Sequence, residues 1–119
     1  MKFNLSKTEL EIMNLLWNKK QWLSGAEFWE YFNNQGKSSK RQTINTYLTR
    51  MVDKGILVKN DKSYMYAYTK EEFDRFRAKE ILDTMYEGSF KKFVTALSGN
   101  DKITSEEAIE LKEYLDKLE

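Results

Sequence analysis

Apolar residues recur at helical spacing in the first third of the chain. The segments "SKTELEIMNLLW" and "SGAEFWEYF" both place large apolar side chains three or four residues apart, as one face of a helix requires. Both open with Ser-x-x-Glu, formed by Ser6 with Glu9 and by Ser24 with Glu27. In such a capping box the serine and the glutamate each accept a backbone N–H at the start of a helix. The pattern therefore predicts two helices, one after Ser6 and one after Ser24.

A third amphipathic segment is "KSSKRQTINTYLTRMVDKGIL", residues 37–57. Ile44, Leu48 and Met51 lie on one side of it at helical spacing. Ser39 is the expected N-cap, and Gly55 is expected to end the helix in the left-handed conformation that glycine tolerates. The sequence thus predicts a third helix with a separate polar face.

The period of the pattern changes to two after this helix. Residues 56–69, "ILVKNDKSYMYAYT", contain an aliphatic run, the turn-forming "NDKS" and an alternating segment with Tyr64, Tyr66 and Tyr68, which together predict a β-hairpin. Three helices followed directly by a hairpin are typical of a winged helix-turn-helix. We therefore expect a mainly α-helical fold with a small β-hairpin, in which residues 1–70 form the winged domain.

The aromatic residues of this part have a structural and a functional interpretation. An alternating tyrosine strand can stack on single-stranded bases, but it is more often half-buried against a helical core. Trp17, Trp22 and Trp29 are expected to be core residues rather than part of a cofactor site.

Residues 71–119 are expected to form a helical dimerisation arm. Helical patterns cover residues 71–86 and 89–97, and Thr104 with Glu107 predicts a further capped helix. A segment this short is marginal as an independent core, so we expect its apolar faces to pack against a second copy of the chain. The residues assigned to this homodimer surface are Phe73, Phe76, Leu82, Met85, Phe90, Phe93, Val94, Leu97, Leu111, Leu115 and Leu118.

Composition restricts the chemistry of the chain. It has no cysteine and no histidine, which removes disulfides, the usual transition-metal ligands and the commonest general base. We expect no metal, no cofactor and no enzymatic activity; an enzyme would need a carboxylate pair in a cleft, and no spacing in the sequence indicates one. The sequence contains no apolar run long enough to span a bilayer, so a cytoplasmic protein is expected.

Charge is divided unevenly along the chain. Residues 1–70 contain 12 Lys or Arg and 6 Asp or Glu, whereas residues 71–119 contain 8 and 13, so a net charge of +1 conceals a basic first part and an acidic second part. A basic domain is a common feature of nucleic-acid binders. It is equally compatible with an unevenly charged, solvated surface.

The polar face of the third helix carries Thr43, Thr46 and Arg50. In the major groove of B-DNA, threonine can contact a thymine methyl group or a base edge, and arginine can bind guanine O6 and N7 together. We therefore predict that these three residues read bases of double-stranded DNA. The residues predicted to contact the DNA backbone are Lys37, Lys40, Arg41, Gln42, Lys59 and Lys62.

Two other interpretations of this face remain open. Taken singly, threonines and an arginine are ordinary residues of a solvated helix. The same helix or the hairpin could also dock a protein partner in a winged-helix interaction module that binds no nucleic acid. Strong salt dependence of binding to duplex DNA distinguishes a DNA-binding domain from such a module, because neutralising phosphates releases counterions.

The chain resembles the penicillinase repressor family, the BlaI/MecI-type winged-helix repressors of β-lactam resistance, over nearly its whole length. The resemblance lies in the segments "TELEIMNLLW", "TINTYLTRMVDKGIL" and "MYEGSF" and in one tyrosine of the predicted hairpin. The matching residues are Glu9, Met13, Asn14, Trp17, Thr43, Ile44, Thr46, Thr49, Arg50, Lys54, Gly55, Tyr68, Tyr86, Gly88 and Phe90.

The resemblance implies a homodimeric repressor whose C-terminal helices interlock. Each winged domain would read one half of an operator with inverted TACA and TGTA elements, and Thr43, Thr46 and Arg50 match the residues with which the family reads bases. Members of the family are released from DNA by cleavage of an Asn-Phe bond, so a regulatory protease acting on the C-terminal domain is an implied partner. The corresponding bond here joins Ala96 and Leu97, without the asparagine.

Overall fold

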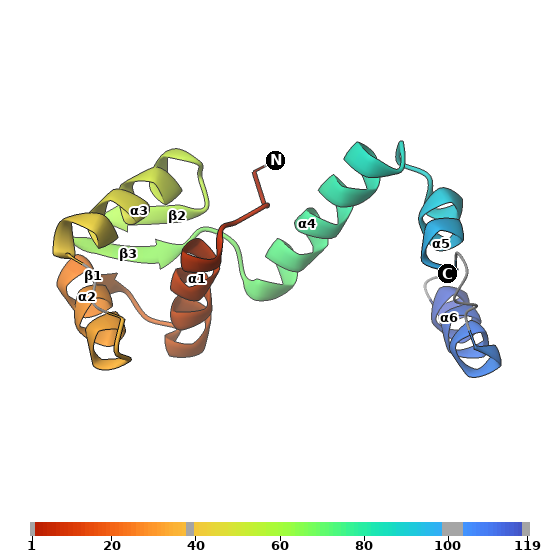
Figure 1. The fold of residues 1–119 in the computed structure, drawn as a ribbon, viewed down its shortest axis with the longest axis horizontal. Helices are drawn as coiled ribbons and strands as arrows, with labels where there is room; N and C mark the ends of the chain where they lie inside the picture. The colour runs from red at the N-terminus through yellow and green to blue at the C-terminus, as the bar shows by residue number, and fades with distance from the viewer. Residues whose placement is uncertain (1, 38–39, 99–103, 118–119) are drawn as a thin grey trace. The chain divides into compact units, whose positions relative to one another are not determined.

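A computed structural model describes residues 2–37, 40–98 and 104–117. The chain forms two compact units, Met1–Glu80 and Ile81–Glu119, as far as these residues define them. The first unit is a winged helix-turn-helix, and the whole is mainly helical with one small sheet, as the sequence predicts (Figure 1). In chain order the elements are α1 (Lys7–Lys19), β1 (Leu23–Ser24), α2 (Gly25–Asn34), α3 (Arg41–Asp53), β2 (Leu57–Asn60), β3 (Ser63–Tyr66), α4 (Lys70–Met85), α5 (Phe90–Ser98) and α6 (Ser105–Lys117).

The predicted capping boxes of α1 and α2 are both present. In α1 the Glu9 N–H donates to Ser6 Oγ at 3.3 Å and the Ser6 N–H donates to the Glu9 carboxylate at 2.9 Å. Ser24 and Glu27 form the same pair of bonds at 3.2 and 3.0 Å. These bonds satisfy amides that a helix start would otherwise leave without a partner, so they fix where both helices begin.

Helix α3 begins differently from the prediction. Ser39, the expected cap, lies outside the described residues, and the N-cap is Lys40, with no side-chain hydrogen bond to the helix amides. The end of the helix is as predicted: Gly55, at φ +78°, lies directly after the C-cap in the left-handed region.

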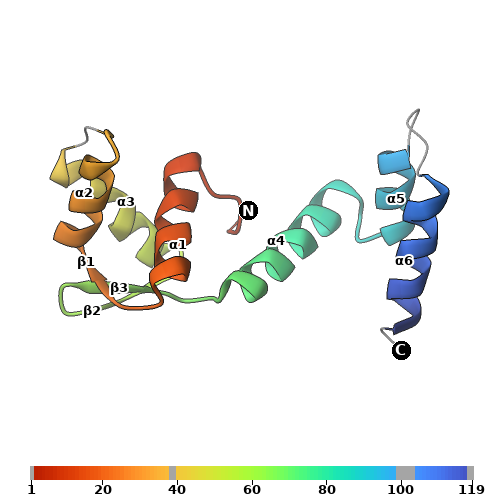
Figure 2. The same cartoon turned by 90° about the horizontal axis from the view of Figure 1, so that it is seen from below.

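The wing contains three strands, one more than the sequence predicts. The hairpin of β2 and β3 is confirmed, and β1 pairs with the other edge of β3, which gives the antiparallel order β1-β3-β2. Leu23 lies opposite Tyr64 in this sheet. A two-residue strand is too short to produce an alternating pattern, so β1 could not be recognised from sequence. Figure 2 shows the sheet on one side of the first unit and α1, α2 and α3 on the other.

One aromatic residue of α4 completes the core of the first unit. Phe73 is only 1% exposed, and its ring lies 5.3 Å from that of Trp17 and 5.5 Å from that of Phe3. The assignment of Phe73 to a dimer surface is therefore wrong, because its apolar surface is already covered within its own chain. Phe76 is half-buried and packs against the same core.

The three tryptophans have different environments. Trp17 is buried, and its Nε1–H donates to the backbone carbonyl of Tyr68 at 3.0 Å. Trp29 is half-buried against the core. Trp22 is 44% exposed, which corrects the expectation that it belongs to the core. It directly precedes the short strand β1, at the margin of the sheet.

The second unit has no comparable core. No described residue from Ile81 onward is buried, and large apolar side chains of α5 and α6 are open to solvent, including Leu97 at 62% and Leu115 at 41% exposure. Gly88 follows α4 at φ +74° and ends that helix before α5 begins. Among the described helices, none is long and apolar enough to cross a membrane.

The bond from Trp17 to the Tyr68 carbonyl joins α1 to the segment between β3 and α4. We expect Trp17→Phe to lower the free energy of unfolding by about 1–2 kcal/mol, because it leaves a partly buried carbonyl without its donor. Trp22→Phe, at an exposed site, should change the free energy of unfolding by less than about 0.5 kcal/mol. Urea denaturation of both variants checks this. Equal small losses would show that the hydrogen bond has no structural role.

Candidate nucleic-acid interface

Packing of the first unit determines which face of α3 reaches solvent. Ile44, Leu48 and Met51 are buried in the core, so the opposite face of the helix is open. Thr43 and Arg50 are exposed on that open face, where the sequence pattern places them. The third predicted reader, Thr46, is exposed as well. All three predicted readers are therefore open to solvent.

A shallow depression of about 370 Å³ follows this open face. Two of the predicted readers, Thr46 and Arg50, line this depression together with neighbouring residues of α3. Its lining residues are Gln42, Asn45, Thr46, Thr49 and Arg50.

Sequence reasoning missed Asn45, whose side chain reaches helix α2. A Cβ atom placed on Gly25 would lie 2.7 Å from Asn45 Oδ1, so a larger residue at this position would require the Asn45 side chain to move. Gly25 is the first residue of α2, directly after the cap Ser24. A glycine at a helix start is a detectable signal of close approach, although it does not identify the neighbour. The contact helps to set α3 against α2.

One predicted reader is restrained by its own helix. Thr46 Oγ1 donates to the Gln42 backbone carbonyl at 2.9 Å. The bond uses the hydroxyl proton, which leaves the oxygen as an acceptor and holds the side chain in one rotamer. Thr46 can therefore offer a methyl group and an acceptor oxygen to a neighbouring molecule.

The residues predicted to contact the DNA backbone differ in whether their side chains already have a partner within the protein. Within the described residues, Lys40, Arg41 and Lys62 are exposed and form no ion pair. Lys37 instead forms an ion pair with the Glu11 carboxylate of α1. Lys59 is exposed on β2, with its Nζ 5.4 Å from the centre of the Tyr64 ring. Gln42 is exposed in the first turn of α3.

The N-terminus of α3 favours an anion. Its N-cap, Lys40, forms no side-chain hydrogen bond to the helix amides, and its first turn contains no acidic residue but does contain Arg41. Each of the other described helices starts with a hydroxyl cap, from Ser6, Ser24, Thr69, Ser89 or Thr104. The positive end of the helix dipole and the two cations both attract negative charge at this point.

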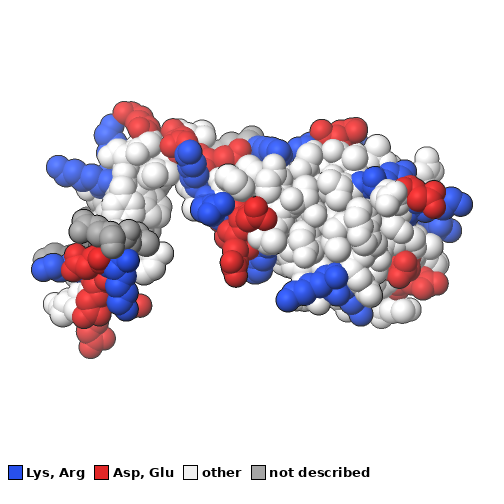
Figure 3. Space-filling view, turned by 180° about the vertical axis from the view of Figure 1, so that it is seen from behind, with Lys and Arg blue, Asp and Glu red and all other residues white. Residues whose placement is uncertain are grey.

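Positive charge does not cover the whole first unit. Figure 3 shows one face of this unit with a large uncharged area at its centre and both basic and acidic side chains around it. On this face of the first unit, positive charge therefore does not form a continuous patch.

An ion pair fixes the C-terminal end of α3. Lys54 Nζ lies 3.4 Å from the Glu9 carboxylate of α1, whose other oxygen accepts the capping N–H of Ser6. Burial raises the pKa of Glu9, but hydrogen bonds from the Ser6 backbone and hydroxyl, together with the Lys54 charge, outweigh it and hold the pKa below its usual value. One carboxylate thus caps α1 and attaches α1 to α3.

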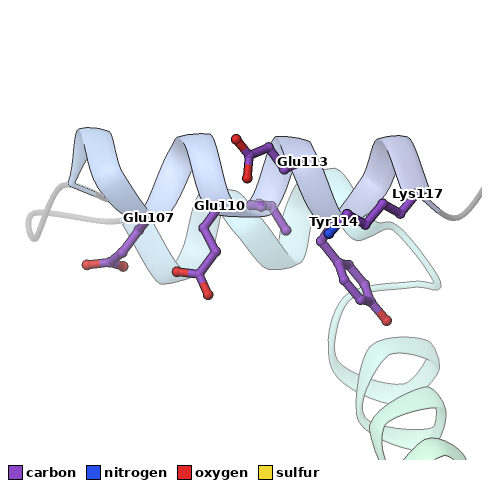
Figure 4. Close-up of a pocket in the computed structure, with 6 residues that line it drawn as sticks. Glu107, Glu110, Glu113, Tyr114 and Lys117 are labelled. Carbon is purple, nitrogen blue, oxygen red and sulfur yellow. The ribbon is translucent and has the colours of Figure 1, made fainter.

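A second depression, of about 460 Å³, lies along α6 and is acidic (Figure 4). Glu107, Glu110 and Glu113 line it, but Glu113 points to the other side of the helix from the first two. Glu107 is engaged by Thr104 at the helix start. Among the described residues, no group of three or more acidic side chains could hold a metal ion.

Comparison with known proteins identifies the family. The sequence profile of the penicillinase repressor family matches residues 5–117. The chain belongs to the penicillinase repressor family. This family consists of repressors, so the chain is a transcriptional regulator.

Individual relatives agree with this assignment. The methicillin resistance regulatory protein MecI of Staphylococcus aureus strain N315 is 29% identical, and the alignment covers 97% of this chain and 95% of that protein. The penicillinase repressor of Staphylococcus aureus is 28% identical, with 96% and 92% covered. The penicillinase repressor of Bacillus licheniformis is 26% identical, with 95% and 90% covered. The similarity therefore spans both units of this family member.

The depressed pKa of Glu9 predicts a pH dependence of stability in this penicillinase repressor family member. A lowered folded-state pKa contributes stability above the unfolded-state pKa, and the contribution is lost as pH falls through the folded-state value. Glu9→Gln keeps an acceptor for the Ser6 N–H but removes the charge. We expect it to lower the free energy of unfolding at neutral pH by about 0.5 kcal/mol, since water screens the pair.

Urea denaturation between neutral pH and about pH 3 checks this expectation, because the difference between Glu9→Gln and the unaltered protein should disappear at the acidic end. Glu30→Gln, at an exposed residue of α2 that forms no ion pair within the described residues, is the matched control. A difference that is the same at every pH would contradict the role assigned to the Glu9 charge.

Proposed function

We propose that this chain represses transcription by binding an inverted-repeat operator as a homodimer, with α3 of each copy in the major groove. The observation that carries the proposal is the open face of α3, on which Thr43, Thr46 and Arg50 lie together in a member of a repressor family. The major groove admits an α-helix and displays a distinct pattern of donors, acceptors and methyl groups for each base pair. A bound dimer would then occlude the promoter.

The three readers supply complementary chemistry. Arg50, which forms no ion pair within the described residues, would bind O6 and N7 of a guanine. Thr46, whose proton is committed to the Gln42 carbonyl, would contact a thymine methyl group or accept from an amino group of a base. Thr43 lies one helical turn before Thr46 and would extend the contact along the groove.

Phosphate contacts would come from the start of α3 and from the hairpin turn. Lys40 and Arg41, at the positive end of the α3 dipole, would bind one phosphate group, and Lys62 at the hairpin turn would approach another. Lys37 and Lys59 remain predicted contacts, but Lys37 would first have to leave Glu11. These contacts position the protein on the duplex, whereas α3 reads the sequence.

Exposure in the second unit supports the homodimer. Its described part buries no side chain, and a segment with so much open apolar surface is stabilised when a partner covers it. Most of the predicted dimer residues are exposed or half-buried there; Ile109 and Tyr114 are further exposed apolar residues that the prediction did not include. The predicted residues still available for the surface are Leu82, Met85, Phe90, Phe93, Val94, Leu97, Leu111 and Leu115, and Leu118 lies outside the described residues.

Release from DNA would follow cleavage in the second unit. A regulatory protease acting on the second unit is the partner that the family implies. Ala96 and Leu97, at the position of the cleaved bond, lie within α5 and lack the asparagine. A bond inside a helix is a poorer protease site than an exposed loop tip, so cleavage here would require α5 to unfold locally.

Variants of a reader and of a phosphate-contacting residue test the proposal. We expect Arg50→Ala to cost about 1–3 kcal/mol of specific binding and to relax the preference at one base position. Lys62→Ala should weaken binding to all sequences similarly. It should also reduce the slope of the logarithm of the binding constant against the logarithm of the salt concentration by about one. Titration of labelled duplexes at several salt concentrations measures both effects. Lys112→Ala, in α6, is the matched control.

Equal small effects of Arg50→Ala and Lys62→Ala, with sequence preference intact, would contradict the assigned roles. Binding to duplex DNA that is weak and shows no sequence preference in the unaltered protein would instead favour the protein-interaction module.

The homodimer has its own test. The double variant Leu97→Asp, Leu115→Asp places two charges on the exposed apolar surface of α5 and α6, and we expect it to sediment as a monomer. Its operator affinity should fall at least about 100-fold, because two linked half-site contacts become one. Lys91→Asp, Lys112→Asp changes polar positions of the same two helices and serves as the control. A double leucine variant that remains dimeric would contradict the proposed surface.

A further inference from the structure

The first residues of the chain attach α4 to the winged unit. Glu80 of α4 accepts two consecutive backbone N–H groups, from Lys2 at 3.0 Å and from Phe3 at 2.8 Å, one on each carboxylate oxygen. We call Lys2, Phe3 and Glu80 the N-terminal clasp. Hydrogen bonds to a charged acceptor are stronger than neutral ones, and two bonds to one carboxylate also fix its orientation.

The clasp is anchored in the aromatic part of the core. Phe3 is buried, and its ring lies 5.2 Å from that of Tyr68, 5.5 Å from that of Phe73 and 5.4 Å from that of Phe76. A short N-terminal segment is usually poorly ordered unless it is held by such contacts. Burial of Phe3 therefore keeps the two N–H groups in place for Glu80.

Lys2 of the clasp also lies close to the C-terminal end of α3. Lys2 Nζ donates to the Tyr68 hydroxyl at 2.8 Å. A Cβ atom placed on Gly55, directly after the α3 C-cap, would lie only 3.2 Å from Lys2 Nζ. Lys2 thus lies beside the C-terminal end of α3 while its backbone N–H and that of Phe3 hold α4, although the β2–β3 hairpin separates these two helices in sequence.

Two separated attachments fix the direction of a helix, whereas one allows it to swing. Phe73 attaches α4 near its start, and Glu80 attaches it seven residues later, roughly 10 Å further along the axis at about 1.5 Å per residue. Phe76 lies between them on the same face. Because α4 is one continuous helix to Met85, it carries the chain from the first compact unit into the second.

From this geometry we infer that the N-terminal clasp sets the half-site spacing that the homodimer accepts. The inference rests on the proposed function. In a dimer joined through the second unit, the direction of α4 relative to α3 determines where each recognition helix meets the duplex. One base pair shifts a half-site by about 3.4 Å along the axis, so a helix held in one direction discriminates between spacings.

The experiment compares the unaltered protein with Glu80→Ala on duplexes that carry inverted TACA and TGTA elements at a series of spacings. The series changes the spacing by one or two base pairs and by about half a helical turn. For the unaltered protein we expect affinity to fall roughly 10-fold or more away from the best spacing, because both half-sites can no longer be bound together. For Glu80→Ala we expect the affinity for the best spacing to exceed that for the other spacings by only about threefold or less. Its affinity for a single half-site should stay unchanged.

Glu71→Ala is the matched control. It removes an exposed carboxylate from the same helix that has no ion pair or hydrogen bond within the described residues, and it should keep the spacing preference of the unaltered protein. Hydrogen exchange of the Phe3 amide verifies that the clasp is closed in the control and open in Glu80→Ala. If Glu80→Ala fails to fold, Glu80→Gln, which keeps one acceptor oxygen, is measured instead and should show a partial loss of the spacing preference.

The outcomes separate two failures. An unaltered protein that binds none of these duplexes would contradict the proposed function itself. An unaltered protein that prefers one spacing, together with a Glu80 variant that has an exposed Phe3 amide and the same preference, would overturn the role of the clasp.

Discussion

Burial of one face of α3 is the constraint on which the interface depends. Ile44, Leu48 and Met51 occupy the core, and this packing turns the threonines and the arginine of the same helix outward. A helix this short has little stability alone, so its rigidity comes from tertiary packing. The ion pair of Glu9 with Lys54 and the contact of Asn45 with Gly25 then fix the helix near its end and its middle. A reading surface requires this rigidity, because a loosely held side chain reads bases poorly.

Local sequence signals were sufficient for most of the first unit. The serine and glutamate pairs of α1 and α2 determine helix starts through bonds that span three residues, and Gly55 ends α3 through its own backbone conformation. The exposed positions of Thr43, Thr46 and Arg50 follow from helical periodicity once the apolar face of α3 is recognised. Such features depend on neighbouring residues, so one sequence contains the information that predicts them.

Features that depend on distant residues were not predictable in this way. Phe73 has the spacing of an ordinary amphipathic helix, and nothing near it in sequence reveals that Trp17 and Phe3 cover it. The ion pair that occupies Lys37 joins residues 26 positions apart, and the bonds from Lys2 and Phe3 to Glu80 span more than 70 positions. Trp22 was misplaced for the opposite reason, because composition favours burial of tryptophan while its site beside a two-residue strand leaves it open.

The central claim is that α3 of two chains reads one inverted-repeat operator. Selection of bound duplexes from a random pool, repeated at two salt concentrations and combined with the stoichiometry of the selected complex, tests it most directly. The account predicts an inverted repeat bound by two chains, with the same sequence recovered at both salt concentrations. Enrichment of no sequence, with weak binding that disappears as salt rises, would contradict the account. The basic residues around α3 would then form only a charged, solvated surface.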